Sequence, residues 1–223
     1  MRFLGALMVF AACHVGGGQA VDPDAAGDGN GPGSDGSNPA LGMFVAWRAD
    51  PTLPGAVSGD ITVSSATFQI DRLEVVGDAG VDARTTRSKY LLSWDAGGKP
   101  SQESFPQAPV GVYSKINVVM AVGNLSENLY EIRGTWTDSG AAPKAFRIRD
   151  RGLSLSSQVD CDKTLPPAAT ASITLRLDLR NALTGINFKM LEDEEGQLDL
   201  RDGPQLAQFR ARLRDAFELG EDE

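Results

Sequence analysis

Residues 109–122, PVGVYSKINVVMAV, are the stretch from which the fold is predicted. Apolar and polar residues alternate in it, which predicts a half-buried β-strand. The face expected in the core holds Val112, Ser114, Ile116, Val118, Met120 and Val122, and the opposite face holds Tyr113, Lys115, Asn117, Val119 and Ala121. Pro109 and Gly111 predict a turn that leads the chain into the sheet. We expect this strand to be a central one.

Strand patterns recur on both sides of this stretch. They cover residues 43–47, 61–76, 90–94, 130–137, 144–149, 153–159 and 171–180, and a loop is expected over the polar residues 78–87. In 61–76 the apolar parity changes near Ser64-Ser65 and again near Asp71-Arg72, which predicts a β-bulge or break at each place. About eight short strands with turns between them predict a mainly β fold, an antiparallel β-sandwich.

The carboxyl-terminal end has a different pattern. Residues 192–195, EDEE, predict a solvated acidic turn rather than a metal site, because no further ligand follows at a clear spacing. From Pro204 the period becomes helical, and Asp202 or Gly203 is the expected cap. The apolar face of this predicted amphipathic helix holds Leu206, Phe209, Leu213 and Phe217. We expect the helix to dock on the sandwich, and a partner-binding helix is the alternative.

The amino terminus predicts export. Residues 1–13, MRFLGALMVFAAC, have one cation, an apolar run and two small residues before Cys13, the pattern of a signal peptide with a lipobox-like end. Cys13 is therefore the predicted lipidation site, and conventional cleavage after Ala20 is the alternative. The Gly/Asp-rich residues 14–40 predict a disordered linker, since they offer almost no large apolar side chain to bury.

The linker does not match a calcium-binding loop. When an EF-hand pattern starts at Asp22, Ala26 falls at the fifth position and Gly33 at the twelfth, where carboxylates are needed. The predicted organisation is a signal peptide over 1–13, the linker over 14–40, a β-sandwich domain over 41–190, and the acidic turn with the docked helix over 191–223.

Several segments together resemble a family. They are FAAC (10–13), PVGVYSKINVVM (109–120), TASITLRLDL (170–179), GQLDL (196–200) and LAQFRARLRDAFEL (206–219). With these segments the chain resembles uncharacterised Gram-negative bacterial lipoproteins that carry a prealbumin-like or immunoglobulin-like β-sandwich, a domain-of-unknown-function family. Gly111 and Tyr113 match the G-x-Y turn of that family. The resemblance implies the fold and an address in the cell envelope, and it implies no functional residues.

Composition and missing motifs narrow the function. A formal charge of −9 repels polyanions, so we expect no nucleic-acid partner. The only histidine is His14, and nucleophile, zinc and phosphate-binding motifs are absent from the sequence. We expect no enzyme activity, no cofactor and no metal, with carboxylate-only catalysis as an open alternative. Cys161 is expected to be inert, because no histidine is near it in the sequence to form the thiolate.

The leading hypothesis is a non-enzymatic envelope lipoprotein, attached to the membrane by its lipid, whose sandwich serves structure or protein–protein contact. The alternative is a small-ligand or carbohydrate-binding module on the cell surface. Such a module would use an exposed aromatic platform, for which Trp47, Trp94 and Trp136 are the candidates. Two coplanar tryptophans on an open face would favour the alternative, and three buried ones would remove the platform.

Overall fold

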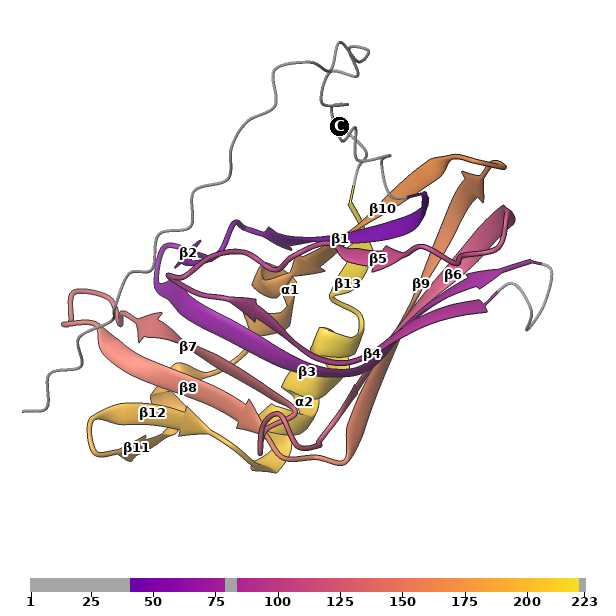
Figure 1. Ribbon diagram of the computed structural model, residues 1–223. Coiled ribbons are helices and arrows are strands. Elements are labelled where there is room, and N and C mark those ends of the chain that lie inside the picture. Colours follow the sequence, from indigo (N-terminus) through magenta and orange to yellow (C-terminus); the bar gives the residue numbers. More distant parts are fainter. Residues whose placement is uncertain (1–40, 79–83, 221–223) are drawn as a thin grey trace, which may run out of the picture. The chain divides into compact units, whose positions relative to one another are not determined.

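The computed structural model describes residues 41–78 and 84–220, which lie in one compact unit, Asn38–Glu223. Its strands form two sheets (Figure 1). The smaller sheet has the order β13 (Phe217–Leu219), β10 (Thr170–Asp178), β1 (Gly42–Asp50), β5 (Glu103–Phe105).

The larger sheet has nine strands. Its main path is β11 (Glu192–Glu194), β12 (Gln197–Leu200), β8 (Lys144–Asp150), β7 (Tyr130–Trp136), β3 (Ile61–Gly77), β6 (Gly111–Ala121), β9 (Ser154–Leu165), while β2 (Gly55–Ala56) and β4 (Arg84–Trp94) pair with β3. The helices are α1 (Leu179–Leu183), the 3-10 turn η2 (Phe188–Met190) and α2 (Gly203–Arg214). Cys13, the signal peptide and the linker fall outside the described residues.

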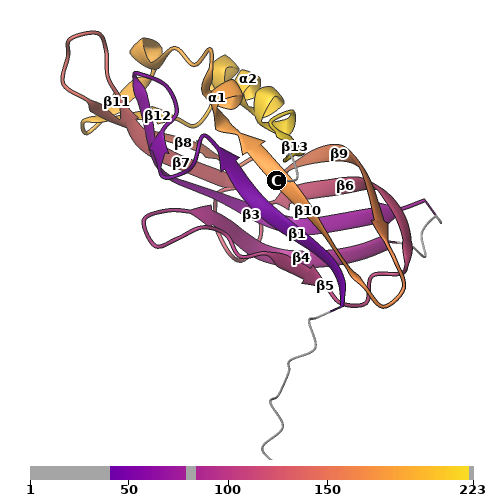
Figure 2. The same ribbon diagram turned by 90° about the horizontal axis from the view of Figure 1, so that it is seen from above.

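The two sheets lie in layers, with β1, β5 and β10 above the strands of the larger sheet (Figures 1 and 2). One apolar core joins them, since buried side chains of both sheets and of α2 belong to a single cluster. The rings of Phe68 in β3 and Phe217 in β13 meet in this core with centroids 6.2 Å apart.

The mainly β prediction is confirmed, but the wholly antiparallel arrangement is wrong. β1 pairs with β10 in parallel, and β8 pairs with β12 in parallel. The residues described contain thirteen strands, not about eight. Parallel neighbours need long crossover connections, and local alternation gives no sign of which distant strand is the neighbour. Very short strands such as β2, β5, β11 and β13 show too few residues for a period.

β3 pairs with more strands than any other. Residues 66–76 of β3 pair with β4, whereas residues 61–68 pair with β7 and residues 70–77 with β6. Because β4 occupies one edge of β3 along this length, β6 and β7 lie end to end along the other edge. The larger sheet thus divides at residue 69 into two branches, β6–β9 and β7–β8–β12–β11. We call this place the branch point.

The bulges predicted in β3 are confirmed. Pairing with β7 shifts register between Val63 and Ser65, and pairing with β6 shifts between Ile70 and Arg72. The strand at residues 109–122 is interior, between β3 and β9, but β3 rather than β6 joins the branches.

Gln69 spans the branch point. Its backbone N–H donates to the carbonyl of Leu129, next to the start of β7, at 2.9 Å. Its side-chain Nε2 donates to the carbonyl of Ala121, the last residue of β6, at 2.5 Å. Gln69 is buried. One residue therefore forms hydrogen bonds to both branches where they meet, in addition to the ladders that pair β6 and β7 with β3.

α2 packs at the branch point. Phe209 meets the ring of Tyr130, the first residue of β7, at 5.6 Å. Arg210 donates to the buried carboxylate of Asp150 at the end of β8 (2.7 Å) and to the carbonyl of Ser154 at the start of β9 (2.9 Å). The helix thus contacts both branches through two adjacent residues.

The predicted faces of β6 are correct only in its second half. Ile116, Val118 and Met120 are buried, but Val112 is 41% exposed and Tyr113 is buried, the reverse of the expectation. A register shift against β9 between Tyr113 and Lys115 explains the exchange of faces. The Tyr113 hydroxyl donates to the Pro109 carbonyl at 2.6 Å and fixes the turn into the strand.

Three other predictions differ from the structure at the ends of helices or strands. The loop predicted over 78–87 is wrong from Arg84, where β4 begins as a polar edge strand. α2 ends at Arg214, so Phe217 belongs to β13 and not to the helix, although it is buried. The acidic residues 192–195 form most of a hairpin, in which Glu195 and Gly196 both have positive φ (54° and 87°).

Candidate functional site

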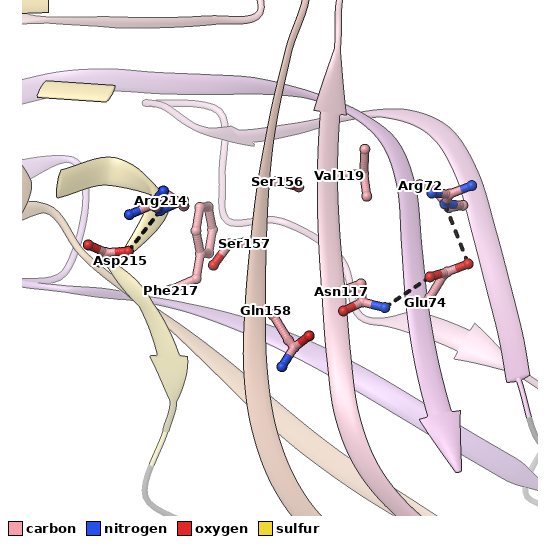
Figure 3. Close-up of a pocket in the computed structure, with 10 residues that line it drawn as sticks. All are labelled: Arg72, Glu74, Asn117, Val119, Ser156, Ser157, Gln158, Arg214, Asp215 and Phe217. Atoms are coloured by element: carbon pink, nitrogen blue, oxygen red, sulfur yellow. Dashed lines mark hydrogen bonds and ion pairs between the residues drawn. The ribbon is translucent and has the colours of Figure 1, made fainter. Parts of the chain in front are cut away.

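One groove on the described part of the chain has a volume of about 650 Å³. Figure 3 shows its ten lining residues, which come from β3, β6, β9 and the corner between α2 and β13. They are Arg72, Glu74, Asn117, Val119, Ser156, Ser157, Gln158, Arg214, Asp215 and Phe217.

Strand register explains six of these positions. Arg72, Val119 and Ser156 are paired across β3, β6 and β9, and so are Glu74, Asn117 and Gln158 in the next row. Alternate residues of a strand lie on one face, so these two rows share the face opposite to the buried Leu73, Val75, Ile116 and Val118. The groove is therefore lined by side chains on rigid strands.

Glu74 is the buried charge of the groove, with a side chain 8% exposed. It accepts a hydrogen bond from the Asn117 side chain at 3.0 Å, and the Arg72 guanidinium lies 3.5 Å from its other oxygen. A buried carboxylate needs such partners to remain charged. The three side chains form one positioned group of donors and acceptors.

The corner between α2 and β13 supplies the other end of the groove. Arg214 pairs with Asp215 at 3.0 Å, and this contact raises the pKa of the Arg214 guanidinium. Phe217 adds a buried apolar ring beside the buried Ser157 (Figure 3). With Arg72 and Glu74 included, the lining holds two positive and two negative groups and has no net charge.

The lining suits reversible binding. It offers amides, hydroxyls and ion pairs, and the two serines have no histidine to activate them because the only one in the chain is His14. Glu74 and Asp215 are each held by an arginine. The arrangement offers donors and acceptors to which polar groups of a ligand could hydrogen-bond.

The three tryptophans do not form the expected platform. Trp47 is 8% exposed, Trp94 1% and Trp136 9%. Trp94 packs edge-on against Phe68 at 6.1 Å, and Trp47 against Phe217 at 6.3 Å, both within the core. The exposed platform is therefore wrong, although Trp136 borders a groove.

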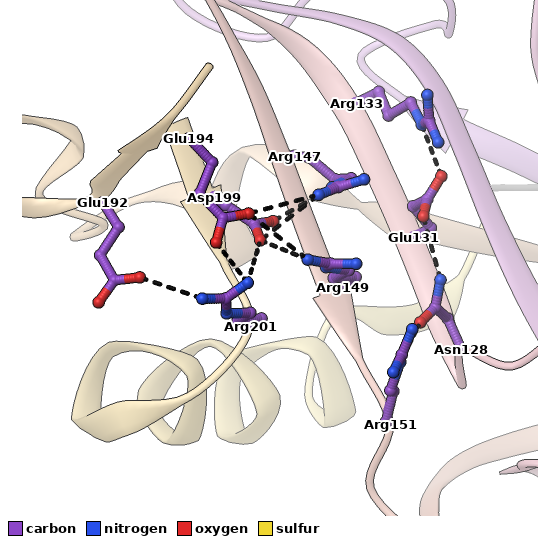
Figure 4. Close-up of polar contacts among 10 residues, drawn as sticks. All are labelled: Asn128, Glu131, Arg133, Arg147, Arg149, Arg151, Glu192, Glu194, Asp199 and Arg201. Carbon is purple, nitrogen blue, oxygen red and sulfur yellow. Dashed lines mark hydrogen bonds and ion pairs between the residues drawn. The ribbon is translucent and has the colours of Figure 1, made fainter. Parts of the chain in front are cut away.

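An arginine network connects β8, β11 and β12 (Figure 4). Its centre is Asp199, whose side chain is 1% exposed and lies 2.6 Å from Arg149 and 3.2 Å from Arg147. Arg201 pairs with Glu194 at 2.5 Å and with Glu192 at 3.4 Å.

Burial by itself raises the pKa of Asp199, but the hydrogen bonds and charges of Arg149 and Arg147 outweigh it and leave the pKa below its usual value. The acids Asp199, Glu192 and Glu194 balance Arg147, Arg149 and Arg201, and the network links β8 to its parallel neighbour β12.

Cys161 lies half-buried on β9. Burial, followed by the charges of Asp160, Asp162 and Asp78, raises the pKa of its thiol to about 11. Such a thiol stays protonated near neutral pH and is a poor nucleophile. Within 41–78 and 84–220 no three histidine, cysteine, aspartate or glutamate side chains are grouped so that they could hold a metal ion.

Sequence reasoning missed every residue of the groove as a site. The alternation in 109–122 places Asn117 and Val119 on the polar face, which is the one signal that could have found part of it. Arg72 and Glu74 belong to the same face, but their neighbours come from strands far away in the chain.

Among the described residues, no helix is long and apolar enough to cross a membrane. No protein-family model, no curated protein and no solved structure matches this chain. The resemblance to envelope lipoproteins stays a prediction from the sequence.

Proposed function

We propose that this chain is a non-enzymatic lipoprotein of the cell envelope that binds a partner protein through the groove between β3, β6, β9 and the α2–β13 corner. Cys13 carries the lipid in this proposal, and residues 14–40 form the tether. The two layered sheets around one core fit the β-sandwich that presents the groove.

The observation that carries the proposal is the groove itself. It has a volume of about 650 Å³, and its lining comes mainly from neighbouring strands with fixed register. The lining contains positive and negative side chains together with amides and hydroxyls. Such a lining is complementary to a polypeptide that carries side chains of both charges.

The edge strand supports a polypeptide rather than a small molecule. β9 ends its branch and pairs only with β6 among the described strands. Ser156, Ser157 and Gln158 line the groove on this strand. Strand edges carry backbone donors and acceptors that bind extended segments of partner proteins.

Site-specific photocrosslinking in intact cells tests the proposal. A benzophenone amino acid replaces Gln158, which is exposed in the groove, and in a control strain it replaces Thr164, which is exposed on the same strand outside the lining. We expect one discrete protein adduct from position 158, which position 164 does not give. Its yield should fall when Arg214→Asp reverses a charge of the groove. Identical products from both positions, or none from 158, would refute the groove as the binding surface.

A further inference from the structure

A second groove, of about 450 Å³, lies at the far end of β7 from the branch point. It is formed by the β2–β3 turn, the end of β7 and the segment from α1 to η2. Its polar and aromatic lining includes Ser58, Asp60, Trp136, Asn187 and Lys189, with Ile61 and Ile186 as aliphatic neighbours.

Trp136 is fixed in this groove from two sides. Its ring stacks on Phe188 with centroids 5.7 Å apart and an interplanar angle of 10°. Its indole N–H donates to the Asp60 carboxylate at 3.3 Å, and the Ser58 hydroxyl donates to the other carboxylate oxygen at 2.6 Å. The aromatic group and the acceptor are thus held before any ligand arrives.

The opposite side offers an amide and an ammonium group. The backbone N–H of Asn187 donates to the side chain of Gln205 in α2 at 2.8 Å, which anchors the segment. The exposed side-chain amide of Asn187 has no partner among the described residues. Lys189 pairs with Asp138 at 2.9 Å.

The charges of this lining are balanced. Asp60 and Lys189 are its only charged residues, and they have opposite signs. A groove without net charge favours neither an anion nor a cation. Its aliphatic and aromatic groups favour the C–H surface of a ligand, and Asp60, Ser58 and Asn187 favour hydroxyl groups.

We propose that this second groove binds a neutral polyhydroxylated ligand of the saccharide class. The proposal does not depend on the groove between β3, β6, β9 and the α2–β13 corner, called the partner groove below, which shares none of its lining residues. Trp136, which is 9% exposed, contributes the part of its side chain that lines the groove, and not one member of a three-tryptophan platform. Asp60 and Asn187 supply an acceptor and a donor for sugar hydroxyls.

Titration of the full chain by NMR tests the proposal, with maltohexaose, cellohexaose and chitohexaose as probes at millimolar concentration. The three indole N–H signals are separate reporters, and Trp136→Phe assigns the one that matters. We expect saturable shifts of the Trp136 indole and of backbone signals from 184–189 with at least one probe. The Trp47 and Trp94 indoles should not move.

Two variants decide whether the shifts report this groove. Asn187→Ala removes an exposed side chain and should weaken binding about three- to tenfold, the effect of one lost hydrogen bond. Arg214→Ala, in the partner groove, should leave the affinity unchanged. The proposal is overturned if no probe saturates, if the shifts centre on other residues, or if Asn187→Ala binds as tightly as the unaltered chain.

Discussion

Gln69 is a buried residue that bonds to the ends of both branches of the larger sheet. At the branch point β6 has ended and β7 has not begun, so part of the β3 edge lacks strand partners. The side-chain amide of Gln69 donates a hydrogen bond to the carbonyl of Ala121. The backbone N–H of Gln69 donates to the carbonyl of Leu129. The side chain of Gln69 is buried, and a buried polar group without a hydrogen-bond partner costs free energy.

Replacing this amide should destabilise the fold. We expect Gln69→Ala to lower the free energy of unfolding by about 1–3 kcal/mol, because the Ala121 carbonyl loses this donor and the packing of a buried side chain is lost. Gln158→Ala is the matched control, an exposed glutamine whose loss should cost no more than about 0.5 kcal/mol. Urea denaturation midpoints measure both. Equal midpoints for the two variants would show that Gln69 does not hold the branches.

The role of Gln69 could not be predicted from the sequence. Its acceptor Ala121 is 52 positions away, and a polar residue between Phe68 and Ile70 fits an ordinary alternating strand. Cys161 is different. Its inertness follows from the absence of a nearby base in the sequence, and the raised thiol pKa agrees with it.

At the scale of elements, β6 gives the sharpest comparison between pattern and structure. The alternation places Val112 and Val118 on one face, but the bulge puts Val112 in solvent and leaves Val118 fully buried. Alternation reports the faces of a strand only while its register is unbroken.

Identical substitutions at these two valines test the shift. Val118→Asn should cost more than about 1.5–3 kcal/mol, since the apolar burial is lost and the new amide has no partner. Val112→Asn should stay within about 0.5 kcal/mol. Chemical denaturation of both variants gives the comparison. Similar losses at the two positions would return Val112 to the core and remove the bulge.

The stability of the fold should depend on pH through Asp199, which lies between β8 and β12. Its pKa is lowered in the folded chain, so it adds stability above its unfolded value of about 3.9, and this contribution is lost as the pH falls through the lower folded value. The free-energy difference between the unaltered chain and Asp199→Asn should be full at pH 7 and shrink below about pH 4.

Denaturation midpoints measured from pH 7 to acid follow that difference. Asp162→Asn, at an exposed carboxylate on β9, should track the unaltered chain throughout. A difference for Asp199→Asn that stays constant or grows in acid would contradict the role given to the arginine network.

Most strands could be located from the sequence, but the strands with which they pair could not. Alternation located β1, β6, β7, β8 and β10, because each buries one face. The parallel pairings of β1 with β10 and of β8 with β12 join strands that are far apart in the sequence, with several other elements between them. Local patterns carry no information about them.

At the scale of the whole molecule, both grooves lie where distant segments meet. The partner groove joins β3, β6 and β9 to the end of α2, and the second groove joins the β2–β3 turn to the segment after α1. Neither group of lining residues has a regular spacing in the sequence that would mark it as a motif. The tryptophans illustrate the difference, since their residue type suggested a platform and their tertiary positions are buried.

The envelope address is the claim on which the rest of the functional account depends, and the intact mass of the mature protein tests it most directly. We predict a chain that begins at Cys13 and carries acyl mass in the membrane fraction, and a Cys13→Ser variant that loses both the acyl mass and the membrane association. A mature chain that begins at Val21 without acyl mass would contradict the lipid anchor.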